Sequence, residues 1–287
     1  MQGKKPNLKL IHIQKLKLCY NEQNMTMLGS DNVRKRNWFS YICYRIVRPF
    51  VQLFFKKMKV EGQENLPDEA CIVVGNHAKM NGPLSGEFYF PGKRRMWCAH
   101  QMMYLKEVPA YAFQDFWSEK PKSVRWFYKI VSYLIAPLSV CIFSNARTLP
   151  VFRDNRLLTT FKLTVTALTE GESVIIFPEC YEPYNHIVYT FQDRFVDVAR
   201  LFYKRTGKAV SFVPLYIAPN LKTMYIGKPI AYDPQIPMEE QRKEIAKYLM
   251  DAVTEMAVNL PRHRVVPYPN IPQKNYPFNK PPKENEK

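Results

Sequence analysis

The chain has 287 residues, enough to bury one sizeable hydrophobic core, so we expect one catalytic domain with short appendages rather than two equal domains. Its 42 Lys and Arg against 25 Asp and Glu leave a formal net charge of +17, which favours anionic partners such as phospholipid headgroups, nucleic acid or nucleotide-bearing molecules. No nucleic-acid recognition motif accompanies the charge, so we do not expect nucleic acid as a partner.

Cysteine usage and hydropathy exclude several classes of protein. The six cysteines lie far apart and form no C-x-x-C pair, so we expect a reducing, intracellular compartment and no metal site. The polar, basic N-terminus lacks the apolar core of a secretory signal. No stretch offers the roughly 18 uninterrupted apolar residues that a spanning helix needs. Any membrane contact is therefore expected from one side only.

The N-terminal part of the chain divides at about residue 30. Residues 1–30 show no sustained period, and we predict a poorly ordered extension. In residues 31–58, large apolar and aromatic side chains recur at helical spacing between clusters of cations, and Pro49 is expected to kink the helix. This pattern is typical of an amphipathic helix lying in a membrane surface, although packing on the protein's own core would produce a similar stripe.

A second apolar segment, Val131–Phe143, is too short to span a bilayer and contains Pro137, which is expected to break it. Its length and composition suit burial in the protein and contact with lipid equally well.

Residues 59–262 alternate strand-like and helix-like pieces, which predicts an α/β domain. Apolar runs predict buried strands at 71–74, 174–177, 210–217 and 224–226. Helical periodicity appears at 157–168, 188–202 and 245–256, with Gly171 and Gly207 ending the first two helices. Residues 263–287 are rich in Pro and Lys, and we predict an extended tail there.

Two of the predicted strands end in polar residues. The run from Cys71 leads directly into Asn76 and His77, which places a histidine at the carboxyl end of a buried strand, where open α/β sheets bind ligands. A histidine in this position also serves often as a structural hydrogen-bonding group. The run from Val174 ends in Phe177-Pro178-Glu179-Cys180.

Between these two runs, Arg153 precedes a predicted helix that Asp154 or Asn155 can cap. A cation beside free backbone N–H groups suits a phosphate, although a solvated surface arginine fits this fragment equally well.

In this order, the pieces resemble the four sequence blocks of the lysophosphatidate and glycerol-phosphate acyltransferase family. The corresponding residues are Asn76-His77, Val151-Phe152-Arg153, Phe177-Pro178-Glu179-Cys180 and Val213-Pro214-Leu215, and the similarity covers about residues 59–255. The resemblance implies a mixed, mostly parallel central sheet flanked by helices, with a peripheral (monotopic) position on the cytoplasmic face of the cell membrane.

The same resemblance implies that His77 is a general base, which deprotonates an acceptor hydroxyl for attack on an acyl thioester. The donor would be acyl-coenzyme A or acyl-carrier protein, with no bound cofactor. The acceptor would be a lysophospholipid or glycerol phosphate. Its binding residues would be drawn from the four blocks: Asn76, Arg153, Phe177, Pro178, Glu179, Cys180 and Pro214.

One departure from the family pattern concerns the aspartate that follows the histidine, because Gly82 stands in its place. Asn81, Glu87 or a backbone carbonyl is expected to orient His77 instead, and a neutral partner stabilises imidazolium less. We therefore expect a slower enzyme or a different acceptor, and the alternative is a lipid-binding homologue that has lost acyl transfer and kept the phosphate cleft. Thiolate catalysis by Cys180 would need His77 or His186 within hydrogen-bond reach.

Overall fold

A computed structural model describes residues 38–118 and 120–281, so the predicted N-terminal extension lies outside the described residues. The chain forms two units, Met1–Cys43 and Tyr44–Lys287. Of the first unit, the structure describes the beginning of helix α2 (Trp38–Phe54), which contains Pro49. The second unit holds the rest of α2 and all the elements below.

A central sheet confirms the predicted fold class. Its strands lie in the order β1 (Lys59–Glu61), β9 (Thr223–Ile226), β8 (Ser211–Ala218), β2 (Ile72–Gly75), β5 (Ser173–Ile176), β3 (Arg94–Ala99) and β4 (Thr148–Val151), with β10 (Ile230–Ala231) also paired with β8. All pairings are parallel except those of β8 with β9 and with β10. The strands predicted at 71–74, 174–177, 210–217 and 224–226 are β2, β5, β8 and β9.

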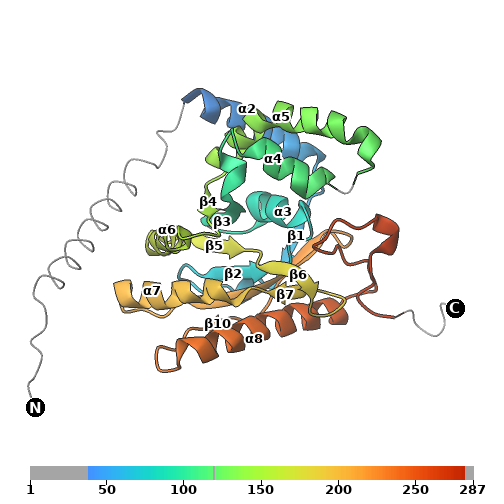
Figure 1. Cartoon of the computed structure of the whole chain (residues 1–287). Helices are drawn as coiled ribbons and strands as arrows, with labels where there is room; N and C mark the ends of the chain where they lie inside the picture. The colour runs from blue at the N-terminus through green and yellow to red at the C-terminus, as the bar shows by residue number, and fades with distance from the viewer. Residues whose placement is uncertain (1–37, 119, 282–287) are drawn as a thin grey trace, which may run out of the picture. The chain divides into compact units, whose positions relative to one another are not determined.

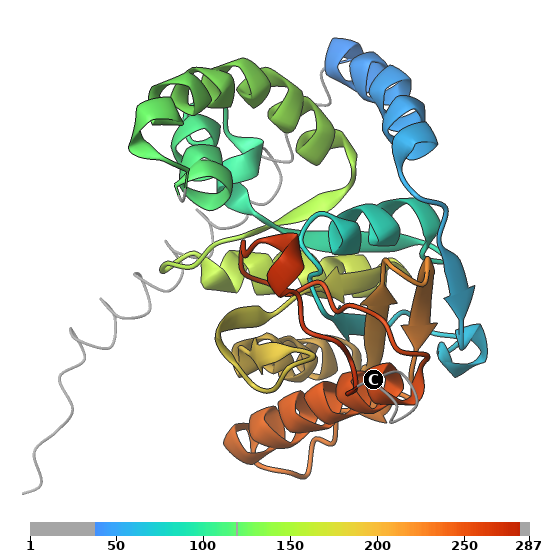
Figure 2. The ribbon, with the colours of Figure 1, turned by 90° about the vertical axis from the view of Figure 1, so that its right-hand side faces the viewer.

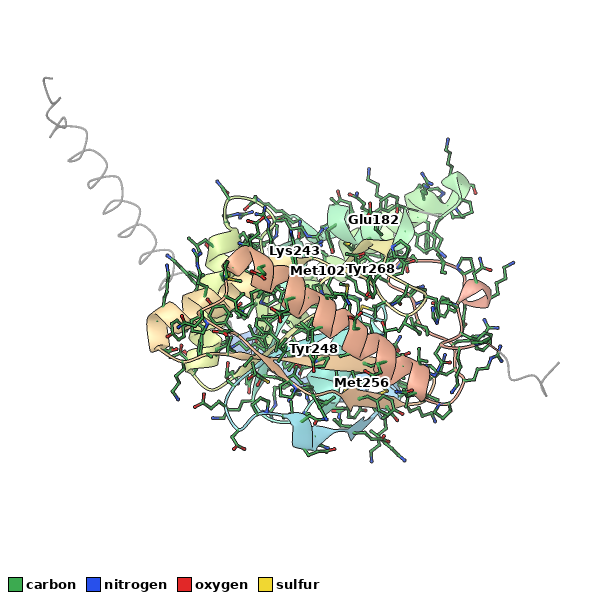
Figure 3. The ribbon with its side chains drawn as sticks, turned by 90° about the horizontal axis from the view of Figure 1, so that it is seen from below. Met102, Glu182, Lys243, Tyr248, Met256 and Tyr268 are labelled. Atoms are coloured by element: carbon green, nitrogen blue, oxygen red, sulfur yellow. The ribbon has the colours of Figure 1, made fainter. Side chains whose placement is uncertain are left out.

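Both faces of the sheet are covered, which explains why β2, β5 and β8 are apolar on both sides. Helices α6 (Leu157–Thr169), α7 (Asp197–Thr206) and α8 (Met238–Asn259) supply residues to the core on one face, and Tyr248 and Met256 mark the course of α8 in Figure 3. The other face is covered by residues that include Phe90, after helix α3 (Asn81–Tyr89), and Phe55, after α2. A short 3-10 helix, η1 (Gln63–Asn65), follows β1.

The helix predicted at 188–202 begins later than expected. Strands β6 (Glu179–Pro183) and β7 (Tyr189–Phe191) form a hairpin, and the 3-10 helix η4 (Asp193–Val196) leads into α7. Val188 and Phe191 are buried, but they reach the core from the hairpin rather than from a helix. The apolar residues of the hairpin and of α7 therefore only happen to follow one another at helical spacing.

A helical region stands between β3 and β4. It contains the 3-10 helix η2 (His100–Met103), α4 (Val108–Ala112), the π-helix η3 (Phe113–Trp117) and α5 (Lys122–Asn145). Helix α5 continues through Pro137, so the predicted break is wrong. By length and composition alone, α5 could cross a membrane, contrary to the sequence-based expectation. The expectation required an uninterrupted run of apolar residues, and α5 contains polar residues such as Ser132 and Ser139. The hydroxyls of these two serines donate to backbone carbonyls, so their polar groups are already paired.

Residues 263–281 are not an extended tail, and we call them the C-terminal strap. Val265 and Val266 are buried in the cores on the two faces of the sheet. Arg264 and Phe278 form an antiparallel bridge around the 3-10 helix η5 (Gln273–Asn275). The prediction weighed the prolines and lysines and gave no weight to the apolar residues between them. Prolines limit the freedom of the unfolded chain, so few apolar contacts suffice to order such a segment.

Candidate active site

The loop after β2 presents His77 at the carboxyl end of the sheet. The Asn76 amide donates to Ile217 O at 3.1 Å and accepts from Ile217 N at 2.7 Å, so it extends the pairing of β2 with β8 by one step. The backbone then turns through Ala78 and Lys79, both at positive φ, before α3 begins. Because its amide bonds to the backbone of β8, Asn76 shapes the loop, and its part in substrate binding stays a prediction.

Glu179 ties the ends of β5 and β2 together. Its carboxylate accepts a hydrogen bond from the His77 backbone N–H at 2.7 Å and another from the Tyr189 N–H at 3.1 Å. Burial raises the pKa of Glu179 to about 7, and the two N–H donors limit the rise. With 5 % of its surface exposed, Glu179 holds His77 in place, whereas the sequence predicted contact with the acceptor.

The His77 imidazole lies between two aromatic rings. The ring centroid of Phe177 is 5.4 Å away and that of Tyr268 is 5.7 Å away, both in edge-on geometry. Burial lowers the pKa of His77 to about 4, and the Lys79 backbone offsets part of this effect. The ring is therefore neutral near pH 7, and its buried Nδ1 has no hydrogen-bond partner within the described residues. A neutral, unpartnered ring nitrogen can accept a proton.

Neither predicted side chain orients this imidazole. Asn81 Nδ2 donates to Ala78 O at 2.9 Å, which closes the turn before α3. The Glu87 carboxylate accepts from Tyr44 Oη at 2.8 Å and from Arg48 Nε at 3.0 Å, so it fastens α3 to α2. Glu87 lies on the other side of α3 from the loop because the chain enters a helix immediately at Asn81, whereas the prediction assumed a longer turn.

The position of the missing aspartate has no room for a side chain. A Cβ atom on Gly82 would lie 2.2 Å from the His77 carbonyl oxygen and 2.9 Å from the His77 carbonyl carbon. The approach is close because the Gly82 N–H donates to that carbonyl at 3.0 Å. In this loop, glycine is required by the path of the backbone.

Arg153 follows β4, at the same end of the sheet as His77, and its side chain is exposed. Burial raises the pKa of Asp115, and the positive charge of Arg153 lowers it. The pKa of Tyr111 is raised by burial and by Asp115, lowered by Arg153, and raised slightly by Tyr268. These effects place Arg153, Asp115 and Tyr111 in one electrostatic neighbourhood with Tyr268, the residue that contacts His77.

The predicted cap of α6 takes a different form. No side chain caps this helix; instead, the Asp154 carboxylate accepts from the backbone N–H of Arg156 at 2.9 Å and pairs with the Arg156 guanidinium. A carboxylate already stands at the start of the helix, so the helix dipole adds less to phosphate binding than the sequence suggested.

The remaining predicted residues lie in different parts of the fold. Pro178 is buried beside Glu179, and Cys180 is half-buried with a free thiol. Pro214 pairs in register with Val74 inside the sheet, so it supports the strand and does not line the mouth of the site. His186 Nε2 lies 3.0 Å from Asn279 O, and nothing in the described residues pairs the Cys180 thiol with a histidine.

Sequence reasoning found Phe177 but missed two other aromatic residues near His77. Tyr268 belongs to the strap that was predicted to be a tail, and Tyr189 belongs to the hairpin that was predicted to be helical. The Val265-Val266 pair was the available signal, because adjacent β-branched residues suit a half-buried extended segment.

Comparison with known proteins gives a limited likeness. No family model and no curated protein matches this sequence. Among solved structures, the chain is similar to the crystal structure of the 1-acyl-sn-glycerophosphate (LPA) acyltransferase PlsC from Thermotoga maritima, with 17% identity and a TM-score of 0.43, over 84% of this chain and 90% of that one. At this distance, a shared backbone does not imply a shared activity.

Proposed function

We propose that the protein is an acyltransferase in which His77 is the general base. The His77 imidazole takes the proton of an acceptor hydroxyl, and the hydroxyl oxygen attacks the carbonyl carbon of an acyl thioester. The tetrahedral intermediate collapses, an ester remains, and the thiolate leaves with the proton that the imidazolium returns. One observation carries the proposal: a neutral imidazole with an unpartnered nitrogen stands at the carboxyl end of a buried parallel strand.

The substrates follow from the sequence blocks and the charges around the site. The acceptor is a lysophospholipid or glycerol phosphate, and Arg153 attracts its phosphate. The donor is acyl-coenzyme A or acyl-carrier protein. Because no carboxylate in the described residues bonds to the His77 ring, the imidazolium is poorly stabilised, so we expect turnover in the lower part of the range that general-base catalysis allows.

We also propose that the enzyme works at a membrane surface. In α2, the exposed residues Ile46, Phe50, Leu53 and Phe54 lie on one helical face. In α5, the exposed large apolar residues include Trp126, Phe127, Ile130, Tyr133, Leu134 and Leu138. The second half of α2 and α5 both lie at the end of the molecule opposite α8 (Figures 1 and 2). Such apolar faces, in a chain of net charge +17, suit an anionic bilayer.

Mass spectrometry of lipids tests the reaction. Purified protein is added to anionic vesicles that contain several lysophospholipids, together with acyl-coenzyme A or acyl-carrier protein donors, and the acylated products are measured. We expect His77→Ala to lose at least about 100-fold in rate, as is typical for a general base, and His186→Ala to keep the wild-type rate. Full activity in His77→Ala, or no product from any acceptor with wild-type protein, contradicts the proposal.

A lipid-binding protein without catalysis is the second candidate, because no described side chain orients the imidazole. A binder would lose affinity for lysophosphatidate-containing vesicles when Arg153 is changed to Gln and would be unaffected by His77→Ala. Restoring the aspartate at Gly82 does not separate the candidates, since a side chain there collides with the His77 carbonyl.

A further inference from the structure

The C-terminal strap lies across the end of the sheet where His77 is placed. In Figure 1 it lies on the side toward which β2 and β5 point, and Figure 2 shows it (red) crossing that edge between α3 and α8. Tyr268, labelled in Figure 3, has its ring centroid 5.7 Å from that of His77 and 6.3 Å from that of Tyr189. The Phe177 ring also contacts the imidazole in edge-on geometry, so two aromatic rings flank His77.

The strap is fastened to the His77 loop by a single cation. Lys79, two residues after His77, donates through Nζ to Tyr276 Oη at 2.8 Å and to Ile271 O at 3.3 Å. The same Nζ lies 4.9 Å from the centroid of the Tyr276 ring. Lys79 itself sits at a positive φ of 56°, a conformation that a lysine adopts at a cost. The contacts with the strap compensate for this strained backbone.

A second attachment is made by Asn270, the neighbour of Ile271. Asn270 Nδ2 donates to the backbone carbonyl of Asp115 at 2.9 Å, which joins the strap to the helical region. Tyr268 therefore lies between the buried Val265-Val266 pair and the attachments at Asn270 and Ile271. Arg264 also holds the strap in its curved form by donating to the carbonyls of Gln273 and Lys274.

Two hollows in the described surface lie away from His77. One runs along α8 and is lined by Glu239, Lys243 and their neighbours, and a smaller one lies between Gly86 and Arg94. His77 borders neither of them. His77 is half-buried, and Tyr268 of the strap is one of the residues that cover its ring.

We infer that the C-terminal strap covers His77, that Lys79 latches it, and that Tyr268 determines which acceptor hydroxyls reach the imidazole. The role in acceptor choice rests on the proposed function, whereas the cover and the latch do not. Because the rings of Tyr268 and Phe177 flank the imidazole, the site takes a hydroxyl on a slender glycerol-type headgroup and rejects one flanked by a ring.

Chemical labelling of histidine tests the cover without any need for catalysis. Diethyl pyrocarbonate modifies neutral imidazole, and peptide mass spectrometry gives a rate for each histidine in the full-length protein. In the wild type we expect His77 to react at least about tenfold more slowly than the exposed His186. Tyr268→Ala should remove most of this protection, whereas Tyr268→Phe, which keeps the ring, should retain it.

Matched lysine variants test the latch. Lys79→Met removes two charge-assisted hydrogen bonds and should raise the labelling of His77 about tenfold or more, because the loss of one such bond changes an opening equilibrium by about that factor. Lys274→Met makes the same substitution elsewhere in the strap. Lys274 contacts Arg264 through its backbone carbonyl, which the substitution keeps, so the labelling of His77 should be unchanged. The buried His100 and His263 report whether each variant remains folded.

Wild-type labelling alone can overturn the inference: if His77 reacts as fast as His186, the strap does not cover it. Equal protection in Tyr268→Ala and wild type, with His100 and His263 still protected, also overturns it.

Acceptor choice is measured separately, as the ratio of kcat/KM for lysophosphatidate to that for lysophosphatidylinositol. We expect Tyr268→Ala to lower this ratio about tenfold and Tyr268→Phe to leave it unchanged; an unchanged ratio in Tyr268→Ala overturns the role in selection. A protein that acylates nothing refutes the proposed function while leaving the labelling result intact.

Discussion

Replacing Gly82 should damage the His77 loop even though it introduces a side chain that helices favour. Gly82 lies in the first turn of α3, where Gly→Ala normally stabilises a helix by about 1 kcal/mol. Here the new Cβ would lie 2.2 Å from the His77 carbonyl oxygen, a backbone atom that cannot rotate away. The loop has to shift, and the hydrogen bond from Gly82 N to His77 O is lost or lengthened.

The size of the effect follows from these two contributions. Overpacking typically costs about 1–3 kcal/mol, and the loss of a backbone hydrogen bond adds about 1 kcal/mol. We therefore expect Gly82→Ala to lower the free energy of unfolding by about 2–4 kcal/mol, which corresponds to a fall of roughly 5–10 °C in Tm. Gly82→Asp should cost at least as much, and it should lower acyl transfer rather than restore it.

Gly86→Ala is the matched control for this measurement, since it makes the same change in the same helix. A Cβ on Gly86 would lie 3.2 Å from the Ile175 side chain, which can adjust. We expect its Tm to stay within a few degrees of the wild type. Thermal unfolding followed by circular dichroism gives both values. If Gly82→Ala is as stable as Gly86→Ala, or if Gly82→Asp increases turnover, the structural explanation for the absent aspartate is wrong.

Two pH-dependent predictions follow from the perturbed groups. Because burial lowers the pKa of His77 to about 4, kcat/KM should stay constant from pH 8 to about pH 5 and fall below that; a midpoint near 6.5 would contradict a buried base. Burial raises the pKa of Glu179 to about 7, so between pH 4.5 and 7 the folded protein binds more protons than the unfolded chain, and its stability falls as pH rises. Glu179→Gln should remove this part of the pH dependence of Tm, and an unchanged slope would refute the assignment.

The α/β core could be predicted from the sequence because its strands are apolar on both faces. The runs at Ile72–Val74 and Val174–Ile176 admit few other structures, and their polar ends then fall at one edge of a parallel sheet. Glu179 and His77 were placed together for this reason. Their contact is between a carboxylate and a backbone N–H, which no pattern of side chains reveals.

The surroundings of His77 could not be predicted because they depend on the path of the backbone. Two consecutive residues at positive φ, Ala78 and Lys79, decide whether Asn81 and Glu87 face the imidazole. Alanine and lysine rarely adopt this left-handed conformation, so the sequence does not predict the turn. Tyr268 is separated from His77 by most of the chain, and the proline-rich composition of the strap concealed its contact with the imidazole.

The charge of the acceptor should compensate for the missing aspartate. An imidazole whose pKa is about 4 takes a proton at pH 7 at a cost of about 4 kcal/mol, and no described side chain offsets that cost. A phosphate held roughly 6 Å from the ring, at an effective dielectric constant of about 20, would stabilise the imidazolium by about 3 kcal/mol and thereby raise the pKa by about two. Under the proposed function, kcat should then be on the order of 100-fold higher for lysophosphatidate than for a monoacylglycerol with the same chain, and the pH profile of kcat for lysophosphatidate should have its midpoint near 6 rather than 4. Equal kcat values for the two acceptors would mean that the phosphate affects binding alone, and the weak base would need another source of stabilisation.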